Sequence, residues 1–245
     1  MTRPRLMREA GRGPVGSSGT ASSPDNTRIA KKTPGPIGLN DSFAPTAGSV
    51  TFRDFTAAQR DEVKSAVKLA LRAIADAKAE LVKAKTQPSR EVMRYFKITG
   101  TTEGDLAGLD LAIAVYDQVA GALLGHERLV FDAERTGPAF GLGKLVGHDV
   151  AAYVWGRGRP APGEEGVVKI VTPKFDASSL EARARVLIHE VSHKYAATVD
   201  EWYLGGGGAG EGDAAAALRN ADSYAHFAFP EGRSPSLQAP IPGAR

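Results

Sequence analysis

The chain has 245 residues, a formal net charge of +3 and no cysteine. Its composition, 42% hydrophobic and 24% charged, is that of an ordinary globular protein and excludes a chain that is disordered or coiled-coil throughout. Without cysteine there is no disulfide framework, thiolate zinc finger, iron–sulfur cluster or cysteine nucleophile, so a metal site would have to use His, Asp or Glu.

The positive charge lies at the start of the chain. Residues 1–48 hold seven Lys or Arg against three acidic residues, a net of +4, and the remainder carries −1. This segment is rich in Gly, Pro, Ser and Thr, which predicts a disordered basic leader. One folded domain is expected over 49–230, followed by a flexible tail at 231–245. The Ala, Arg and Gly bias indicates a bacterial source.

The sequence opens without the apolar stretch of a signal peptide, and no apolar run approaches the roughly 20 residues that span a bilayer. We therefore expect no membrane partner, and either a cytoplasmic protein or one exported by a signal-independent route. The leader is a candidate contact for a delivery or export partner.

Three helices are expected in the first half of the domain. Thr56 and Gln59 form a capping box, and apolar residues follow at spacings of three and four as far as Leu81. The next helices are expected at 91–96 and, after Thr102, as far as Gly125.

The second half begins with β-branched and aromatic runs separated by Gly and Pro clusters, which predicts a small antiparallel sheet. Ser178 and Glu181 then form a second capping box before a largely buried helix. A glycine run, 205–208, precedes a last helix at 213–227. The strand-like runs are 128–131, 150–155 and 167–172.

The buried helix contains the pattern HExxH at 189–193. Residues four apart share one helix face, so His189 and His193 can reach a single ion, while Glu190 can touch a water on that ion. A bound Zn²⁺ acidifies such a water, and a neighbouring carboxylate can take its proton. Lone buried histidines are more often ordinary core residues, so a third ligand decides the matter.

Four positions discriminate among zinc sites of this kind. The longer metzincin pattern requires Gly and His where this chain has Ala196 and Val199, so that class is excluded. A thermolysin-like site would take Glu211, which lies in a glycine-rich stretch. Asp200, seven residues beyond His193, is the best geometric candidate because the chain is expected to leave the helix there and turn back.

Two further motifs resemble those of the aspzincins, the deuterolysin and peptidyl-Lys metalloendopeptidase family. The run TVDEWY at 198–203 resembles TxDxxY, and NADSYAHF at 220–227 resembles NADxYxxF. The resemblance implies an α+β, zincin-like metallopeptidase domain, mostly helical, with an HExxH active-site helix. It also implies that His189, His193 and Asp200 bind one Zn²⁺, that Glu190 is the general base, and that Tyr203 donates its hydroxyl to the developing oxyanion.

Substrate preference is implied by the second motif. In lysine-specific members, the Asp of NADxY and an acidic residue three positions later meet the substrate's ammonium group. Asp222 is present as a candidate substrate-binding residue, but the later position is Ala225. The competing interpretation is that Asp222 orients a zinc-bound histidine.

The sequence thus predicts a zinc-dependent metalloendopeptidase that acts on a protein or peptide substrate, and the resemblance to aspzincins implies a preference for Lys after the scissile bond. The first alternative is a catalytically inactive zinc-binding domain. The second is a nucleic-acid-associated protein that uses its basic N-terminal arm, but no docking motif supports it and no nucleic-acid partner is expected.

Overall fold

The fold is taken from a computed structural model, which describes residues 49–100, 102–136, 151–154, 166–201 and 212–230. The predicted leader and tail lie outside these residues and stay predictions. The helices and strands are, in chain order, β1 (Val50–Arg53), α1 (Ala57–Ala84), α2 (Arg90–Phe96), α3 (Glu103–Leu123), β2 (Leu129–Glu134), β3 (Ala152–Tyr153), β4 (Val167–Val171), α4 (Thr172–Ala177), α5 (Leu180–Tyr195), α6 (Ala214–Arg219) and α7 (Ala221–Ala228).

The first three helices begin where the sequence predicts. Thr56 Oγ1 accepts a hydrogen bond from the Gln59 N–H at 3.2 Å, and Gln59 Oε1 accepts one from the Thr56 N–H at 3.1 Å. This capping box satisfies backbone N–H groups that a helix start otherwise leaves without partners. Thr102 caps α3 with its hydroxyl oxygen, which accepts from the Asp105 N–H at 3.2 Å, and Gly125 leaves that helix with a φ of 78°. The predictions for α1, α2 and α3 are confirmed.

The strands form one mixed sheet in the order β1-β2-β4-β3. Strands β1, β2 and β4 pair in parallel, and only β3 runs antiparallel, to β4. The prediction of an antiparallel sheet is therefore correct for that pair alone. Parallel neighbours need a crossover connection of a dozen or more residues, and α1, α2 and α3 form this crossover between β1 and β2. The four-residue strand β1 was not predicted.

Two helix boundaries also differ from the prediction. The N-cap of α5 is Ser179, whose hydroxyl accepts from the Ala182 N–H, whereas Ser178 ends α4 and donates its hydroxyl to the Lys174 carbonyl. The last predicted helix is divided into α6 and α7 because Asn220 between them is extended, with φ −84° and ψ 121°. Its backbone pairs instead with that of Val199.

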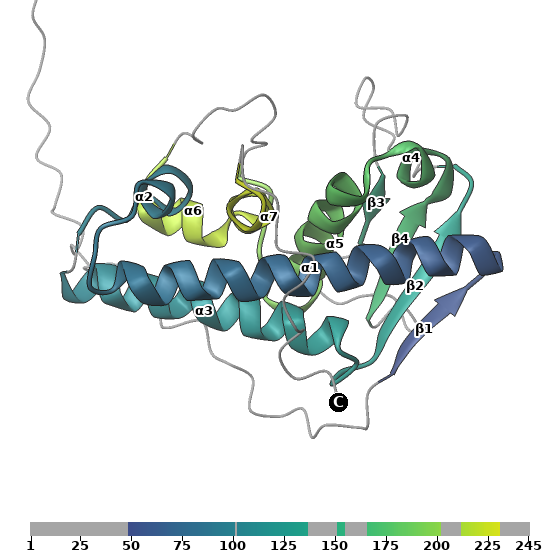
Figure 1. Ribbon diagram of the computed structural model, residues 1–245, viewed down its shortest axis with the longest axis horizontal. Helices are drawn as coiled ribbons and strands as arrows, with labels where there is room; N and C mark the ends of the chain where they lie inside the picture. Colours follow the sequence, from purple (N-terminus) through teal and green to yellow (C-terminus); the bar gives the residue numbers. More distant parts are fainter. Residues whose placement is uncertain (1–48, 101, 137–150, 155–165, 202–211, 231–245) are drawn as a thin grey trace, which may run out of the picture. The chain divides into compact units, whose positions relative to one another are not determined.

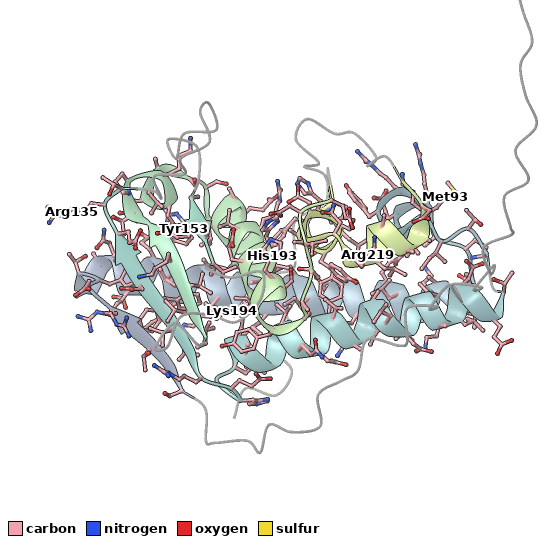
Figure 2. The ribbon with its side chains drawn as sticks, turned by 180° about the vertical axis from the view of Figure 1, so that it is seen from behind. Met93, Arg135, Tyr153, His193, Lys194 and Arg219 are labelled. Atoms are coloured by element: carbon pink, nitrogen blue, oxygen red, sulfur yellow. The ribbon has the colours of Figure 1, made fainter. Side chains whose placement is uncertain are left out.

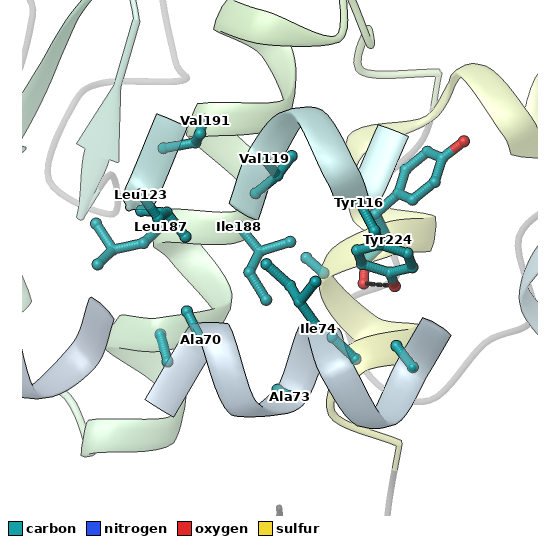
Figure 3. Packing of buried hydrophobic residues seen from close by; sticks show 14 of the residues in the cluster. Ala70, Ala73, Ile74, Tyr116, Val119, Leu123, Leu187, Ile188, Val191 and Tyr224 are labelled. Atoms are coloured by element: carbon teal, nitrogen blue, oxygen red, sulfur yellow. Dashed lines mark hydrogen bonds between the residues drawn. The ribbon is translucent and has the colours of Figure 1, made fainter. Parts of the chain in front are cut away.

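Helix α5 is the element that joins the helices to the sheet. It packs against α1, α3 and α7, and it also contacts β3 and β4 (Figure 1). Its buried side chains, Leu187, Ile188 and Val191, lie among those of α1 and α3, including Ile74 and Leu123 (Figure 3). Burying an aliphatic side chain of this size contributes roughly 1.5–3 kcal/mol. The motif helix is therefore held by the main apolar core.

An aromatic contact fixes α7 against α3. The Tyr116 hydroxyl, on α3, donates to the Tyr224 backbone carbonyl at 2.8 Å, and the two rings meet edge to face (Figure 3). The Tyr224 hydroxyl donates in turn to the Leu218 carbonyl at 2.7 Å. Both tyrosines are fully buried, and burial raises the pKa of each hydroxyl, so both stay neutral donors.

Among the described residues, α3 alone has the length and apolar composition that a membrane span requires. It packs along α1, and its Asp110 and Asp117 pair with Lys85 and Lys78 of that helix. Core helices pass the same test of length and composition, and the contacts of α3 are those of a core helix.

Candidate metal centre

The HExxH motif lies in the C-terminal half of α5, between the sheet and helices α6 and α7 (Figure 2). The two histidines are one turn apart, and their Nε2 atoms lie 3.0 Å from each other. The apolar residues of the same turns point into the core, which leaves the imidazoles on the opposite, polar side. The side chains of His189 and His193 are only 13% and 12% exposed.

Asp200 brings a third donor atom to the histidines. The helix ends at Tyr195, and Ala197 adopts a left-handed conformation, with φ 53°, that turns the chain back. Asp200 Oδ1 then lies 3.1 Å from His189 Nε2 and 3.0 Å from His193 Nε2. The Asp200 side chain is 29% exposed, so the group is open to solvent on its side.

These three residues fit a zinc ion. Nitrogen and oxygen ligands about 2.0–2.1 Å from one tetrahedral Zn²⁺ lie roughly 3.3 Å from each other, and the observed separations are close to that value. The donor set, two imidazoles and one carboxylate, is the kind found where zinc keeps a position for water or substrate. Within the described part of the chain, this is the one group of three such residues arranged to hold a metal ion.

Each histidine is oriented through its other ring nitrogen. His189 Nδ1 lies 2.7 Å from Asp222 Oδ1, and His193 Nδ1 lies 2.8 Å from the Thr198 carbonyl oxygen. Both acceptors hold a proton on Nδ1, so Nε2 is the ring nitrogen of each histidine that can bind a cation once it carries no proton. The alternative predicted for Asp222, orientation of a histidine, matches this contact.

Two buried hydroxyl groups tie the end of α5 to the turn that follows. Ser192 Oγ donates to the His189 carbonyl at 2.7 Å and lies 2.7 Å from Thr198 Oγ1. Sequence reasoning did not predict a role for Ser192. The available signal was a small polar residue inside HExxH, on a helix that was expected to be largely buried. The structure shows that Ser192 is fully buried.

The segment that carries Asp200 is joined to the break between α6 and α7. We call this contact the 199–220 joint: the Val199 N–H donates to the Arg219 carbonyl at 2.8 Å, and the Ala221 N–H donates to the Val199 carbonyl at 3.0 Å. The Glu201 N–H also donates to Asn220 Oδ1 at 3.1 Å. The joint thus places the described start of the 198–203 motif beside the start of the 220–227 motif.

The site shifts the pKa values of three of its groups. Burial raises the pKa of Glu190 to about 7, although the two histidines oppose the shift. Burial alone would lower the pKa of His189, but its hydrogen bonds with Asp200 and Asp222 outweigh that effect and raise it to about 10. Hydrogen bonds from His189 and His193 hold the pKa of Asp200 far below its usual range. The cluster therefore favours a positive charge between the three donor atoms.

The structure brings together four of the residues that the sequence singled out, His189, His193, Asp200 and Asp222, with Glu190 buried beside them. Tyr203 and the thermolysin-like alternative Glu211 lie outside the described residues, so their predictions stand as predictions. The competing identification of the two histidines as ordinary core residues does not explain why three donor atoms converge.

No protein-family model matches this chain, and no curated protein sequence does either. Its structure is similar to that of a zinc peptidase from Grifola frondosa, with a TM-score of 0.51 and 18% sequence identity. The match covers 71% of this chain and 96% of the peptidase. The chain therefore has an α+β, zincin-like fold, and its HExxH motif lies on a helix of that fold.

Proposed function

We propose that this protein is a zinc-dependent endopeptidase. The observation that carries the proposal is the convergence of the His189, His193 and Asp200 donor atoms, each within 3.1 Å of the others, beside the buried Glu190. The likeness of the fold to a zinc peptidase supports the same reaction class. A bound Zn²⁺ would acidify water and polarise a peptide carbonyl.

Glu190 is the proposed general base. It would accept a proton from the attacking water and deliver that proton to the departing amine. A base works best when its pKa lies near the operating pH, and burial raises the pKa of Glu190 to about 7. The rotation of the imidazoles is restricted by Asp222 and by the Thr198 carbonyl, which keep the Nε2 atoms aimed at one point.

Two finer assignments rest on the resemblance to aspzincins. Tyr203 is proposed to donate a hydrogen bond to the oxyanion. A preference for Lys after the scissile bond is proposed from Asp222. That carboxylate already contacts His189, and Ala225 is a buried residue in place of the second acidic one, so a single carboxylate would have to serve both roles.

The decisive experiment combines metal analysis with peptide cleavage by wild type and by Glu190→Gln. We expect both proteins to bind one zinc ion, and cleavage by the variant to fall by about 100-fold to 10,000-fold, the usual contribution of a general base. Stoichiometric zinc without hydrolysis by wild type would instead identify an inactive zinc-binding domain. Full activity of Glu190→Gln would contradict the mechanism.

The substrate preference needs its own measurement. Cut sites in a denatured proteome, mapped by mass spectrometry, should be enriched for Lys immediately after the cleaved bond if Asp222 reads the substrate. Cleavage without that enrichment would leave the endopeptidase proposal intact and remove the preference.

A further inference from the structure

Asn220 interrupts what would otherwise be one continuous helix. The residues on both sides of it are helical, but its own backbone is extended and its side chain is fully buried. Asn is a favourable N-cap residue, yet its side chain makes no capping hydrogen bond to the backbone of α7. The helix start therefore does not explain why an amide is buried at this position.

The Asn220 amide is used by the segment that carries the candidate metal ligand. Its Oδ1 accepts from the Glu201 N–H at 3.1 Å, and its Nδ2 has a longer contact, 3.5 Å, with Ser223 Oγ. On the other side of Asp200, Val199 makes two backbone hydrogen bonds to the residues that flank Asn220. Asp200 is thus held by hydrogen bonds at the residue before it and at the residue after it.

The same joint also places the second carboxylate of the site. Asp222 lies two residues after Asn220, in the first turn of α7, and contacts His189. Asn220 therefore hydrogen-bonds the residue after one carboxylate of the site, Asp200, and lies two residues before the other, Asp222. A change at Asn220 would move Asp200 relative to both imidazoles without removing any donor atom.

We propose that Asn220 is a positioning residue that holds Asp200 in the geometry required for tight zinc binding. The inference rests on the proposed zinc centre and deepens it. Its physical basis is preorganisation: a ligand on a free turn must be ordered when the ion binds, whereas a ligand on the 199–220 joint is already in place. Partners that hydrogen-bond a metal ligand directly are typically worth about 10-fold to 100-fold in metal affinity, and Asn220, which acts through the backbone of Glu201, is expected at the lower end of that range.

The test compares Asn220→Ser with Asn220→Asp. Serine is also a favourable start for α7, but its hydroxyl is one atom too short to reach the Glu201 N–H, so the zinc dissociation constant should rise at least about tenfold. Aspartate keeps an oxygen at the Oδ1 position, so its affinity should stay at or above roughly one third of the wild-type value. Affinity is measured by competition with a chelator, below the melting temperature of each metal-free protein.

A control separates the two contacts of the amide. Ser223→Ala removes only the longer Nδ2 contact and should bind zinc within about threefold of wild type. A merely structural role for Asn220 would lower the metal-free melting temperature of Asn220→Ser and leave its zinc affinity unchanged. Unchanged affinity in Asn220→Ser, or an equal loss in Ser223→Ala, would overturn the proposal.

A second pair of variants tests the joint from the other side if Asn220→Ser does not fold. Glu201→Pro removes the backbone N–H that donates to Asn220 Oδ1. Glu201→Ala keeps this N–H and loses only the ion pair with Arg219. Wild-type zinc affinity in Glu201→Pro would also overturn the proposal.

These measurements also distinguish failure of the Asn220 proposal from failure of the proposed function. If wild type binds no zinc at all, the proposed function fails. If wild type binds and cleaves while both tests leave affinity unchanged, only the role of Asn220 fails.

Discussion

Two parts of this domain bury side chains of different chemistry. Helices α1 and α3 meet through apolar side chains, and the charges between them are surface ion pairs. Between residues 189 and 223, by contrast, lie six of the eight buried polar or charged residues of the described chain, Glu190, Ser192, Thr198, Asn220, Asp222 and Ser223. Apolar burial stabilises without needing particular partners, whereas buried polar groups are tolerated only when each finds one.

Stability and site geometry therefore depend on different regions of the domain. Changes in the α1–α3 pair should alter the free energy of unfolding and leave zinc affinity alone. Removal of a donor atom between 189 and 223 should instead lower zinc affinity and change the free energy of unfolding of the metal-free protein little.

Asp200→Ala should have the largest effect on zinc binding. It removes a donor atom itself, so the loss should exceed the 10-fold to 100-fold range of supporting residues and reach about 1,000-fold or more. The metal-free melting temperature should move by less than about 4 °C, because the side chain is partly exposed. Chelator competition and thermal melting check both halves, and wild-type affinity in the variant would exclude Asp200 from the donor group.

Ile74→Ala should lower stability and leave zinc affinity unchanged, the opposite of Asp200→Ala. Ile74 is 1% exposed in the core between α1, α3 and α5, so its truncation should lower the free energy of unfolding by about 2–5 kcal/mol. Val82→Ala, at a position of the same helix that is 55% exposed, is the matched control and should change it by less than about 0.5 kcal/mol. Both folded variants should bind zinc like wild type. A large loss of affinity in Ile74→Ala would break the division.

Zinc affinity should rise with pH. In the metal-free protein the pKa of His189 is raised to about 10, so at neutral pH zinc must displace a proton from this imidazole. Each displaced proton gives roughly a tenfold increase in affinity per pH unit, and we expect that slope between pH 7 and 9. Competition measurements at several pH values test it. A flat profile would show that His189 is already neutral before the ion binds.

Lys78→Ala should have the smallest effect of these variants, a small change in the free energy of unfolding. Lys78 pairs with Asp117 across α1 and α3, and both side chains are substantially exposed, at 34% and 57%. Exposed pairs contribute about 0–1 kcal/mol and weaken in salt. A double-mutant cycle with Asp117→Ala measures the coupling, and a coupling well above that range would mean that the α1–α3 pair depends on specific polar contacts after all.

The same division explains what the sequence could predict. The capping box of α1 and the apolar spacing of α1 and α3 are local signals, and they located these two helices because the helices also satisfy them in three dimensions. The HExxH spacing and the position of Asp200 are local too, and they located the donor group. The orientation of His189 by Asp222 needed contact between segments distant in the chain, so the sequence left it as one of two alternatives.

The features that were missed depend on tertiary contacts. The apolar pattern continues through Asn220, so nothing in the spacing breaks the helix there, and the break follows from hydrogen bonds to Val199 and Glu201. Parallel pairing of β1 with β2 likewise depends on the path of the three helices between them. Ser178 and Ser179 are neighbours with the same side chain, so the local sequence could not decide which of them caps α5.

The parallel pairing of β1 and β2 has a consequence for the order in which the chain assembles. Arg53 and Asp132, which pair across these strands, are 79 residues apart in the chain, whereas His189 and Asp222 are only 33 apart. Closing the longer loop costs roughly 0.8 kcal/mol more conformational entropy, and non-local pairing slows folding. The segments that carry His189 and Asp222 can thus come into contact, and bind an ion, before the sheet is complete. Refolding should therefore be faster with zinc present from the start than with zinc added afterwards.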